Sequence, residues 1–260
     1  MSLTNQQRKM IRRLQTRHGR RRSRFILCEG LRCCREALAR RPELVELVVC
    51  SQTLAESADG AGLSALAQVA DAVVHPVDDR TFSDLSATES PQGILCVLTR
   101  PEPPPAESRD PFVLILDEVQ DPGNAGTIVR TAWAAGLNEV WVTRGAVDLY
   151  APKTVRAGMG AQFALTLRQF DSLATACDCA GQLGFTTVWY ASPDEGISCY
   201  SDEFGFDGAA LVLGNEARGV SGTVPGRHVT IPMPGNAESL NVAQAATLLL
   251  FEGVRRGVLK

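Results

Sequence analysis

The sequence predicts an α/β protein: a C-terminal domain built on a largely parallel sheet with helices on both faces, preceded by a smaller α/β domain. Two observations support this fold class. Between residues 112 and 260, short apolar runs alternate with longer helical patterns, which is typical of strands and helices in a parallel sheet. A proline-rich stretch separates this half from an earlier and shorter strand–helix series.

Apolar runs bounded by turn residues predict the strands, and amphipathic or alanine-rich runs predict the helices. In the first half we expect strands at 24–29, 44–50, 72–75 and 93–98, and helices at 30–40 and 63–70. In the second half we expect strands at 112–117, 139–143, 185–191, 209–213 and 228–231, and helices at 125–135, 153–161, 173–183 and 241–256.

The last predicted helix is apolar on nearly all sides, since only Gln244 and Thr247 are polar between Val242 and Phe251. Such a helix must be covered almost all round. A dimer interface would provide this cover, and so would burial within a monomer.

The proline-rich stretch is the predicted linker. Five of the fourteen prolines fall between Arg100 and Pro111, a density that favours an extended, semi-rigid spacer. The expected organisation is therefore a basic arm at 1–23, a small domain at 24–100, the linker at 101–111 and a larger domain at 112–260.

Charge is distributed very unevenly along the chain. Residues 1–41 hold thirteen Lys and Arg against two acids, so the remainder carries −14 although the whole chain carries only −3. A basic segment on an acidic body is typical of a nucleic-acid-binding protein, and a solvated helix is the alternative. Met10, Ile11 and Leu14 predict one apolar helical stripe in this segment. Its expected RNA contacts are Arg12, Arg13, Arg20, Arg21 and Arg22.

The sequence predicts neither a membrane protein nor a metal site. No apolar run, including Leu248–Phe251 with its Ala-rich approach, is long enough to span a bilayer, and the basic N-terminus lacks the apolar core of a signal peptide. The eight cysteines include no Cys-x-x-Cys pair, so reduced structural thiols are expected. We expect a cytoplasmic protein without a bound metal.

Three short stretches place glycine and asparagine at or just after the end of an apolar run: 121–130 (DPGNAGTIVR), 213–219 (LGNEARG) and 231–243 (IPMPGNAESLNVA). Glycine allows a strand to end in a tight loop, and such a loop exposes backbone N–H groups to a ligand. Three such loops in one half of the chain predict one composite site.

In this order the three stretches resemble the signature motifs of the SpoU, or TrmH, branch of the SPOUT RNA methyltransferases. The resemblance implies methylation of a ribose 2′-hydroxyl in structured RNA with S-adenosylmethionine as the donor, a trefoil knot and a homodimer. Residues 25–30 and 86–93 resemble the substrate-binding domain that precedes the catalytic domain in many members. This arrangement resembles enzymes that modify large-subunit ribosomal RNA, in housekeeping or in antibiotic resistance, and transfer RNA is the open alternative.

The resemblance assigns the catalytic positions to Asn124, Arg130, Glu216, Ser239 and Asn241. It implies that Asn124 orients Arg130, which contacts an RNA phosphate. Because a guanidinium stays protonated, we expect Arg130 to clamp phosphate and stabilise the forming alkoxide rather than remove a proton. Helix capping is the structural alternative for Asn124, Glu216 and Ser239. A surface ion pair is the alternative for Arg130.

The resemblance also implies a cofactor pocket and a second RNA-facing segment. The expected cofactor contacts are Leu213, Gly214, Ile231, Met233 and Leu240. The second segment resembles an Arg-Ala-Ser-x-Gly motif in which Gly158 replaces the serine, and Lys153 and Arg156 are expected to face RNA.

Two other functions are alternatives to this one. A nicotinamide- or nucleotide-binding α/β enzyme would need a Gly-x-Gly-x-x-Gly loop or a Walker lysine, and the sequence has neither at the expected place. A non-catalytic RNA-binding protein of the same fold is the second alternative, since fold alone does not establish activity.

Overall fold

The computed structural model describes residues 3–107, 110–222 and 224–260 and consists of two compact units. The first unit comprises Met1–Glu102 and Asp148–Ala164, and the second comprises Pro103–Val147 and Leu165–Lys260. The described part of the predicted linker, 101–107 and 110–111, contains no helix or strand. Residues 108–109 of this linker and residues 1–2 of the predicted arm lie outside the described residues.

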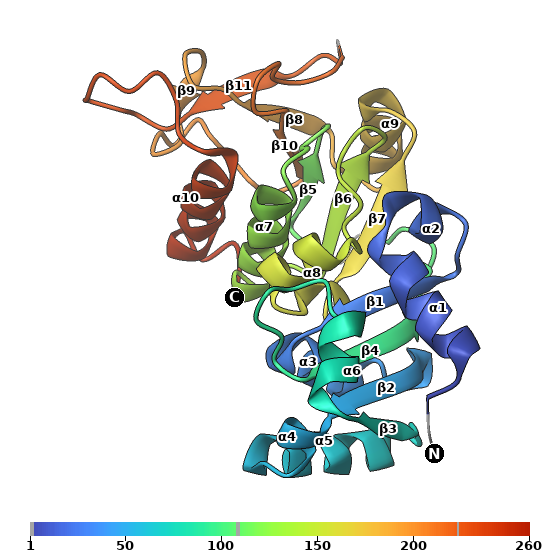
Figure 1. Cartoon of the computed structure of the whole chain (residues 1–260). Coiled ribbons are helices and arrows are strands. Elements are labelled where there is room, and N and C mark those ends of the chain that lie inside the picture. The colour runs from blue at the N-terminus through green and yellow to red at the C-terminus, as the bar shows by residue number, and fades with distance from the viewer. Residues whose placement is uncertain (1–2, 108–109, 223) are drawn as a thin grey trace. The chain divides into compact units, whose positions relative to one another are not determined.

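The second unit is built on a seven-stranded sheet in which all neighbouring strands are parallel, as predicted (Figure 1). The strand order is β7-β6-β5-β10-β8-β11-β9. The strands are β5 (Phe112–Leu116), β6 (Glu139–Thr143), β7 (Thr166–Phe170), β8 (Thr187–Ala191), β9 (Ile197–Ser198), β10 (Ala209–Leu213) and β11 (Arg227–Thr230).

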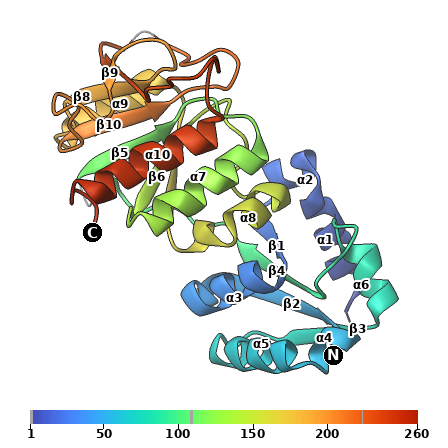
Figure 2. The same ribbon diagram turned by 90° about the vertical axis from the view of Figure 1, so that its left-hand side faces the viewer.

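Helices cover both faces of this sheet. Figure 2 shows α7 and α10 side by side on one face and α9 on the other. Every residue of β5 is buried, which is expected of a central strand covered on both sides. The helices are α7 (Pro122–Ala134), α9 (Leu173–Gln182) and α10 (Val242–Arg255).

Two strands of this sheet, β7 and β9, were not predicted from the sequence. β7 lies at one edge of the sheet, and its residues Thr-Leu-Arg-Gln-Phe are all partly or fully exposed, so the apolar signal is weak. β9 has only two residues. The predicted helix 153–161 ends earlier, at Gly158, because Met159 and Gly160 adopt left-handed backbone conformations (φ 53° and 85°).

The first unit contains a four-stranded sheet of order β1-β4-β2-β3, in which β4 is antiparallel to β1 and β2, and β2 is parallel to β3. Its strands are β1 (Phe25–Glu29), β2 (Val45–Ser51), β3 (Val74–Val77) and β4 (Ile94–Thr99). Its helices are α1 (Asn5–Gln15), α2 (Arg17–Arg21), α3 (Leu31–Arg40), α4 (Gln52–Ala55), α5 (Ala58–Val69), α6 (Asp79–Leu85) and α8 (Pro152–Gly158).

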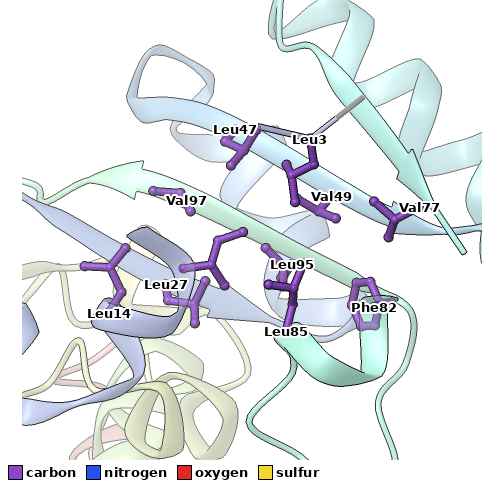
Figure 3. Packing of buried hydrophobic residues seen from close by; sticks show 11 residues of the cluster. Leu3, Leu14, Leu27, Leu47, Val49, Val77, Phe82, Leu85, Leu95 and Val97 are labelled. Carbon is purple, nitrogen blue, oxygen red and sulfur yellow. The ribbon is translucent and has the colours of Figure 1, made fainter. Parts of the chain in front are cut away.

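The basic N-terminal segment is part of this unit's core. Leu14 of α1 lies in one buried cluster with Leu27 and Leu95 of the sheet (Figure 3). Ile11 belongs to the same cluster, and Met10 packs against it. The predicted apolar stripe is thus a packing face. Because its removal would expose the core, the segment cannot be treated as a detachable arm.

Asp148–Ala164, which the sequence pattern groups with the C-terminal domain, packs within the first unit. Asp148 accepts from the Nε of Arg20 (3.0 Å) and lies 3.3 Å from the guanidinium of Arg100. These cations hold the pKa of the Asp148 carboxyl below its usual value although burial alone would raise it.

No helix in the described residues is long and apolar enough to cross a membrane. All eight cysteines are free thiols, and most are buried.

Candidate active site

The site lies where β5 and β10 end side by side, with Leu213 opposite Leu116. Asp117, which follows β5, is completely buried. Its carboxylate accepts hydrogen bonds from the hydroxyls of Thr143 (2.7 Å) and Ser221 (2.9 Å) and from the backbone N–H of Ser221. A buried carboxylate is stable only with such donors, so Asp117 ties the end of β5 to β6 and to the loop after β10.

Asp117 was not among the predicted site residues. Its sequence signal was an acidic residue that directly follows a strand made entirely of apolar residues. This pattern could have marked it as a buried, hydrogen-bonded carboxylate.

The loop 213–219 is closed by its own backbone. Asn215 and Gly219 exchange two backbone hydrogen bonds, at 2.8 and 3.0 Å. A Cβ at Gly214 would lie 2.5 Å from the Gly219 carbonyl carbon and 2.7 Å from the Val220 nitrogen. Gly214 is therefore required for loop closure, because any other residue would place its Cβ against this backbone.

The side chain of Asn215 fixes the same loop from inside. It is buried, its Nδ2 donates to the Glu118 carbonyl (2.9 Å), and its Oδ1 accepts the N–H groups of Ala217 (3.0 Å) and Arg218 (3.1 Å). With its side chain anchored in this way, Asn215 holds the backbone on both sides of Glu216.

Three of the predicted catalytic residues form one hydrogen-bonded chain. Nδ2 of Asn124 donates to Glu216 (2.9 Å), and Nδ2 of Asn241 donates to Oδ1 of Asn124 (2.9 Å). Each residue comes from a different one of the three motifs. The sequence prediction of a composite site is consistent with this arrangement.

The Glu216 carboxylate has two further donors, the backbone N–H groups of Gln120 (3.3 Å) and Asp121 (3.4 Å). Partial burial alone would raise the pKa of Glu216, but these hydrogen bonds and the one from Asn124 outweigh it, so the pKa lies below its ordinary value. Glu216 is thus an ionised anchor for the start of α7.

The residues that cap α7 and α10 are not those for which capping was the alternative role. Asp121 caps α7 by accepting the Asn124 N–H (2.8 Å), so Asn124 is not the cap. Its side-chain amide can therefore hydrogen-bond to Glu216 and Asn241. Asn241 caps α10 by accepting the Ala243 N–H (2.9 Å). Ser239 is exposed, and in the described part of the chain its hydroxyl has no hydrogen-bond partner.

Arg130 is exposed on α7, and within the described residues its guanidinium has no ion-pair partner. The alternative of a surface ion pair is therefore not observed. The Asn124 amide hydrogen-bonds to Glu216 and Asn241, and among the described residues no hydrogen bond joins it to Arg130.

A cavity of about 400 Å³ lies beside the hydrogen-bonded residues Glu216, Asn124 and Asn241. This volume is within the range for small-molecule sites. All five predicted cofactor contacts line it, together with Glu216, Ser239 and Asn241. The lining residues that were missed include three consecutive residues at the end of β8 and just after it, Ala191, Ser192 and Pro193, and Leu249 on α10. The strand-then-turn pattern at 185–193 could have indicated the first three.

The predicted RNA-binding residues belong to the first unit. Arg12, Arg13, Arg21 and Arg22 are exposed, and so is Lys153.

Arg20 corrects the prediction. It is buried, and its guanidinium donates to the carbonyls of Leu14 (3.1 Å) and Gln15 (2.9 Å) as well as to Asp148. Because these partners occupy it, Arg20 holds α1 and α2 together and is not a surface contact for RNA.

Comparison with known proteins agrees with the motifs. Residues 111–251 match the model of the SpoU rRNA Methylase family, and residues 5–96 match the MRM3-like substrate binding domain. The chain is similar to the 23S rRNA (guanosine(2553)-2'-O)-methyltransferase RlmP of Bacillus subtilis (strain 168), at 33% identity over 256 residues and 96% of each chain.

Two solved structures are similar over nearly the whole chain. An AdoMet-bound rRNA methyltransferase from Sinorhizobium meliloti matches with a TM-score of 0.79 and 28% identity, over 100% of this chain and 98% of that one. The SpoU methyltransferase AviRb from Streptomyces viridochromogenes matches with a TM-score of 0.81 and 26% identity, over 97% of each.

The closed loop 213–219 gives a first prediction. Gly214→Ala should lower the free energy of unfolding by about 1–3 kcal/mol, because the added methyl group meets backbone atoms that cannot rotate away. It should also speed amide hydrogen exchange at 213–221. Gly222→Ala is the matched control, since a Cβ there meets nothing within 4 Å. Equal stability of the two variants would contradict the closure argument.

Proposed function

Since the chain belongs to the SpoU rRNA methylase family, as its three motifs predict, we propose that it transfers a methyl group from S-adenosylmethionine to a ribose 2′-hydroxyl of large-subunit ribosomal RNA. The observation that carries this proposal is the cavity at which all three motifs meet, with the Glu216–Asn124–Asn241 chain at its side.

The residues that line the cavity fit the donor. Ile231, Met233 and Leu240 supply apolar walls for an adenine ring, and the ends of β8 and β10 offer backbone groups for hydrogen bonds. When bound there, S-adenosylmethionine supplies an already activated methyl group on a sulfonium.

The protein's own task is then to position the ribose and to stabilise charge. Glu216 and Asn124 act as positioning residues, because their polar groups are bound to one another and to backbone. Arg130 is free to bind a phosphate of the RNA and to favour the alkoxide that forms as the 2′-hydroxyl loses its proton.

The RNA class rests on the relatives. RlmP is by its name a 23S ribosomal RNA enzyme, and the N-terminal residues 5–96 match the MRM3-like substrate binding domain. A trefoil knot and a cytoplasmic location belong to the same proposal. Transfer RNA is the alternative substrate, and the following experiment distinguishes it from ribosomal RNA.

Incubation of the full chain with methyl-labelled S-adenosylmethionine and purified RNA classes tests this function. We expect label in unmodified large-subunit ribosomal RNA, at one ribose that resists alkaline cleavage afterwards. Label in transfer RNA would change the substrate. Absence of transfer to any RNA, with S-adenosylmethionine bound, would favour a non-catalytic RNA-binding protein.

Arg130 gives a sharper prediction. Arg130→Lys should reduce methyl transfer nearly as much as Arg130→Ala, at least tenfold, because lysine keeps the charge but loses the planar fork that binds phosphate. Calorimetry should find S-adenosylmethionine affinity unchanged. Arg144→Ala, which removes another exposed arginine of the second unit, is the control. Near-normal turnover of the lysine variant would mean that the position supplies only charge.

We also propose a homodimer formed through α10. Leu248, Phe251 and Val254 lie three residues apart on one helix face and are 43%, 46% and 38% exposed. Packing within a single chain therefore leaves this apolar face of α10 partly exposed to solvent. Sedimentation at micromolar concentration should give the dimer mass, and Phe251→Glu should shift it towards the monomer. Val69→Glu, at a more exposed valine on α5, should not. A wild-type monomer with full activity would contradict the dimer.

The exposed arginines of α1 and α2 and the adjoining Arg22 are proposed to bind RNA phosphates. Replacing Arg12, Arg13, Arg21 and Arg22 by glutamine should weaken RNA binding at low salt. It should also flatten the salt dependence, by roughly 0.7–0.9 in slope for each phosphate that is no longer neutralised. The methylated nucleotide should stay the same, because binding to phosphates carries little sequence information. An unchanged salt slope would leave these arginines as a solvated surface.

A further inference from the structure

The first unit contains a second cavity, of about 410 Å³, that shares no lining residue with the first. Its walls come from the end of β1, the start of α3, the loop between α6 and β4, and the end of α8. The polar lining residues include Glu29, Thr88, Ser90, Gln92, Arg32 and Arg156.

A buried carboxylate shapes this cavity. Glu29 is only 2% exposed and accepts hydrogen bonds from the hydroxyls of Ser86 and Thr88 (2.9 Å for Thr88) and from the N–H of Ala87 (3.3 Å). The loop 86–88 is thus wrapped around one side chain of β1. Its position is fixed before any ligand arrives.

Arg156 brings an unsatisfied donor to the same place. Its Nη1 lies 3.8 Å from Oε2 of Glu29, which is an ion-pair distance but too long for a hydrogen bond. This nitrogen is buried and has no hydrogen-bond partner among the described residues. A buried N–H without an acceptor is costly, so an acceptor atom of a ligand would stabilise it.

Other groups around the cavity are also available. Gln92 uses its Oε1 to accept the Leu31 N–H (2.9 Å), which leaves its amide N–H donors free. In the described part of the chain, the Arg32 guanidinium and the Ser90 hydroxyl have no hydrogen-bond partner. Leu31 and Met159 contribute apolar surface beside these donors.

We propose that this cavity binds one unpaired nucleotide of the RNA, distinct from the nucleotide that is methylated, with the base inside and its phosphate on Arg32. This inference rests on the proposed function for the RNA itself. Two arginines against one carboxylate favour an anionic ligand. The apolar walls and the amide and hydroxyl groups suit the face and edges of a base. A duplex presents a broad surface that cannot enter a cavity of this size.

The test uses the full chain and labelled RNA oligonucleotides, followed by fluorescence anisotropy. The probes are single-stranded A8 and U8, and a duplex of the same length. The double variant Arg32→Met, Arg156→Met should bind single strands about tenfold more weakly, with a smaller effect on the duplex. Arg35→Met, which removes an exposed arginine of the same helix α3 that does not line the cavity, should stay within twofold of wild type. Ser90→Trp, which fills the cavity from an exposed position without changing charge, should reproduce the loss.

Competition and cofactor binding complete the test. A nucleoside monophosphate should displace the single strand at lower concentration than inorganic phosphate. S-adenosylmethionine affinity should be equal in all variants, so a wild-type protein that fails to bind this cofactor would contradict the proposed function and leave the cavity result standing. The inference is overturned if the Ser90→Trp variant binds single strands like wild type. It is also overturned if phosphate competes as well as the nucleotide, or if duplex binding falls equally.

Discussion

The amide of Asn124 is the group on which the arrangement of the candidate active site depends. It donates to Glu216 and accepts from Asn241, and so links the three segments that follow β5, β10 and β11. An amide can do this because it carries a donor and an acceptor at once. A carboxylate or an ammonium at position 124 would satisfy only one neighbour and leave the other without a partner.

The sheet makes this link possible, because parallel strands bring their carboxyl ends to one edge. β5 and β10 are neighbours in register, so the loops that follow them start side by side although about a hundred residues separate them in sequence. Asp117 accepts two hydrogen bonds from Ser221 and so fixes the loop that follows β10. The hydrogen bonds of Asp117 and Asn215 fix the backbone, and the chain of Asn124 and its partners fixes the side chains above it.

Most of the fold could be predicted because local signals determined it, and the predicted residues that line the first cavity were named from the resemblance of the three motifs. Strands such as β5 and β10 are continuous apolar runs, and the loops after them carry glycine and asparagine. β7 could not be predicted, because an edge strand needs no apolar face on both sides. Arg20 could not be separated from its exposed neighbours either. Its burial depends on Asp148, which is 128 residues away in sequence and has no local signal. The grouping of 148–164 with the first unit was hidden for the same reason, since it arises from long-range packing.

The titratable groups around the first cavity limit how the reaction can be assisted. Among the described residues that line it, only Glu216 can ionise, and its pKa is lowered while its oxygens are occupied by three donors. An anion of this kind is a weak proton acceptor, since a good general base has a pKa near the working pH. A guanidinium offers no acceptor atom for a proton, so Arg130 cannot be the base either. If the donor is a sulfonium, the methyl group needs no further activation, and the remaining barrier concerns the geometry and charge of the attacking oxygen. The site is therefore built for positioning and electrostatic stabilisation, which explains why so many of its polar groups bind one another.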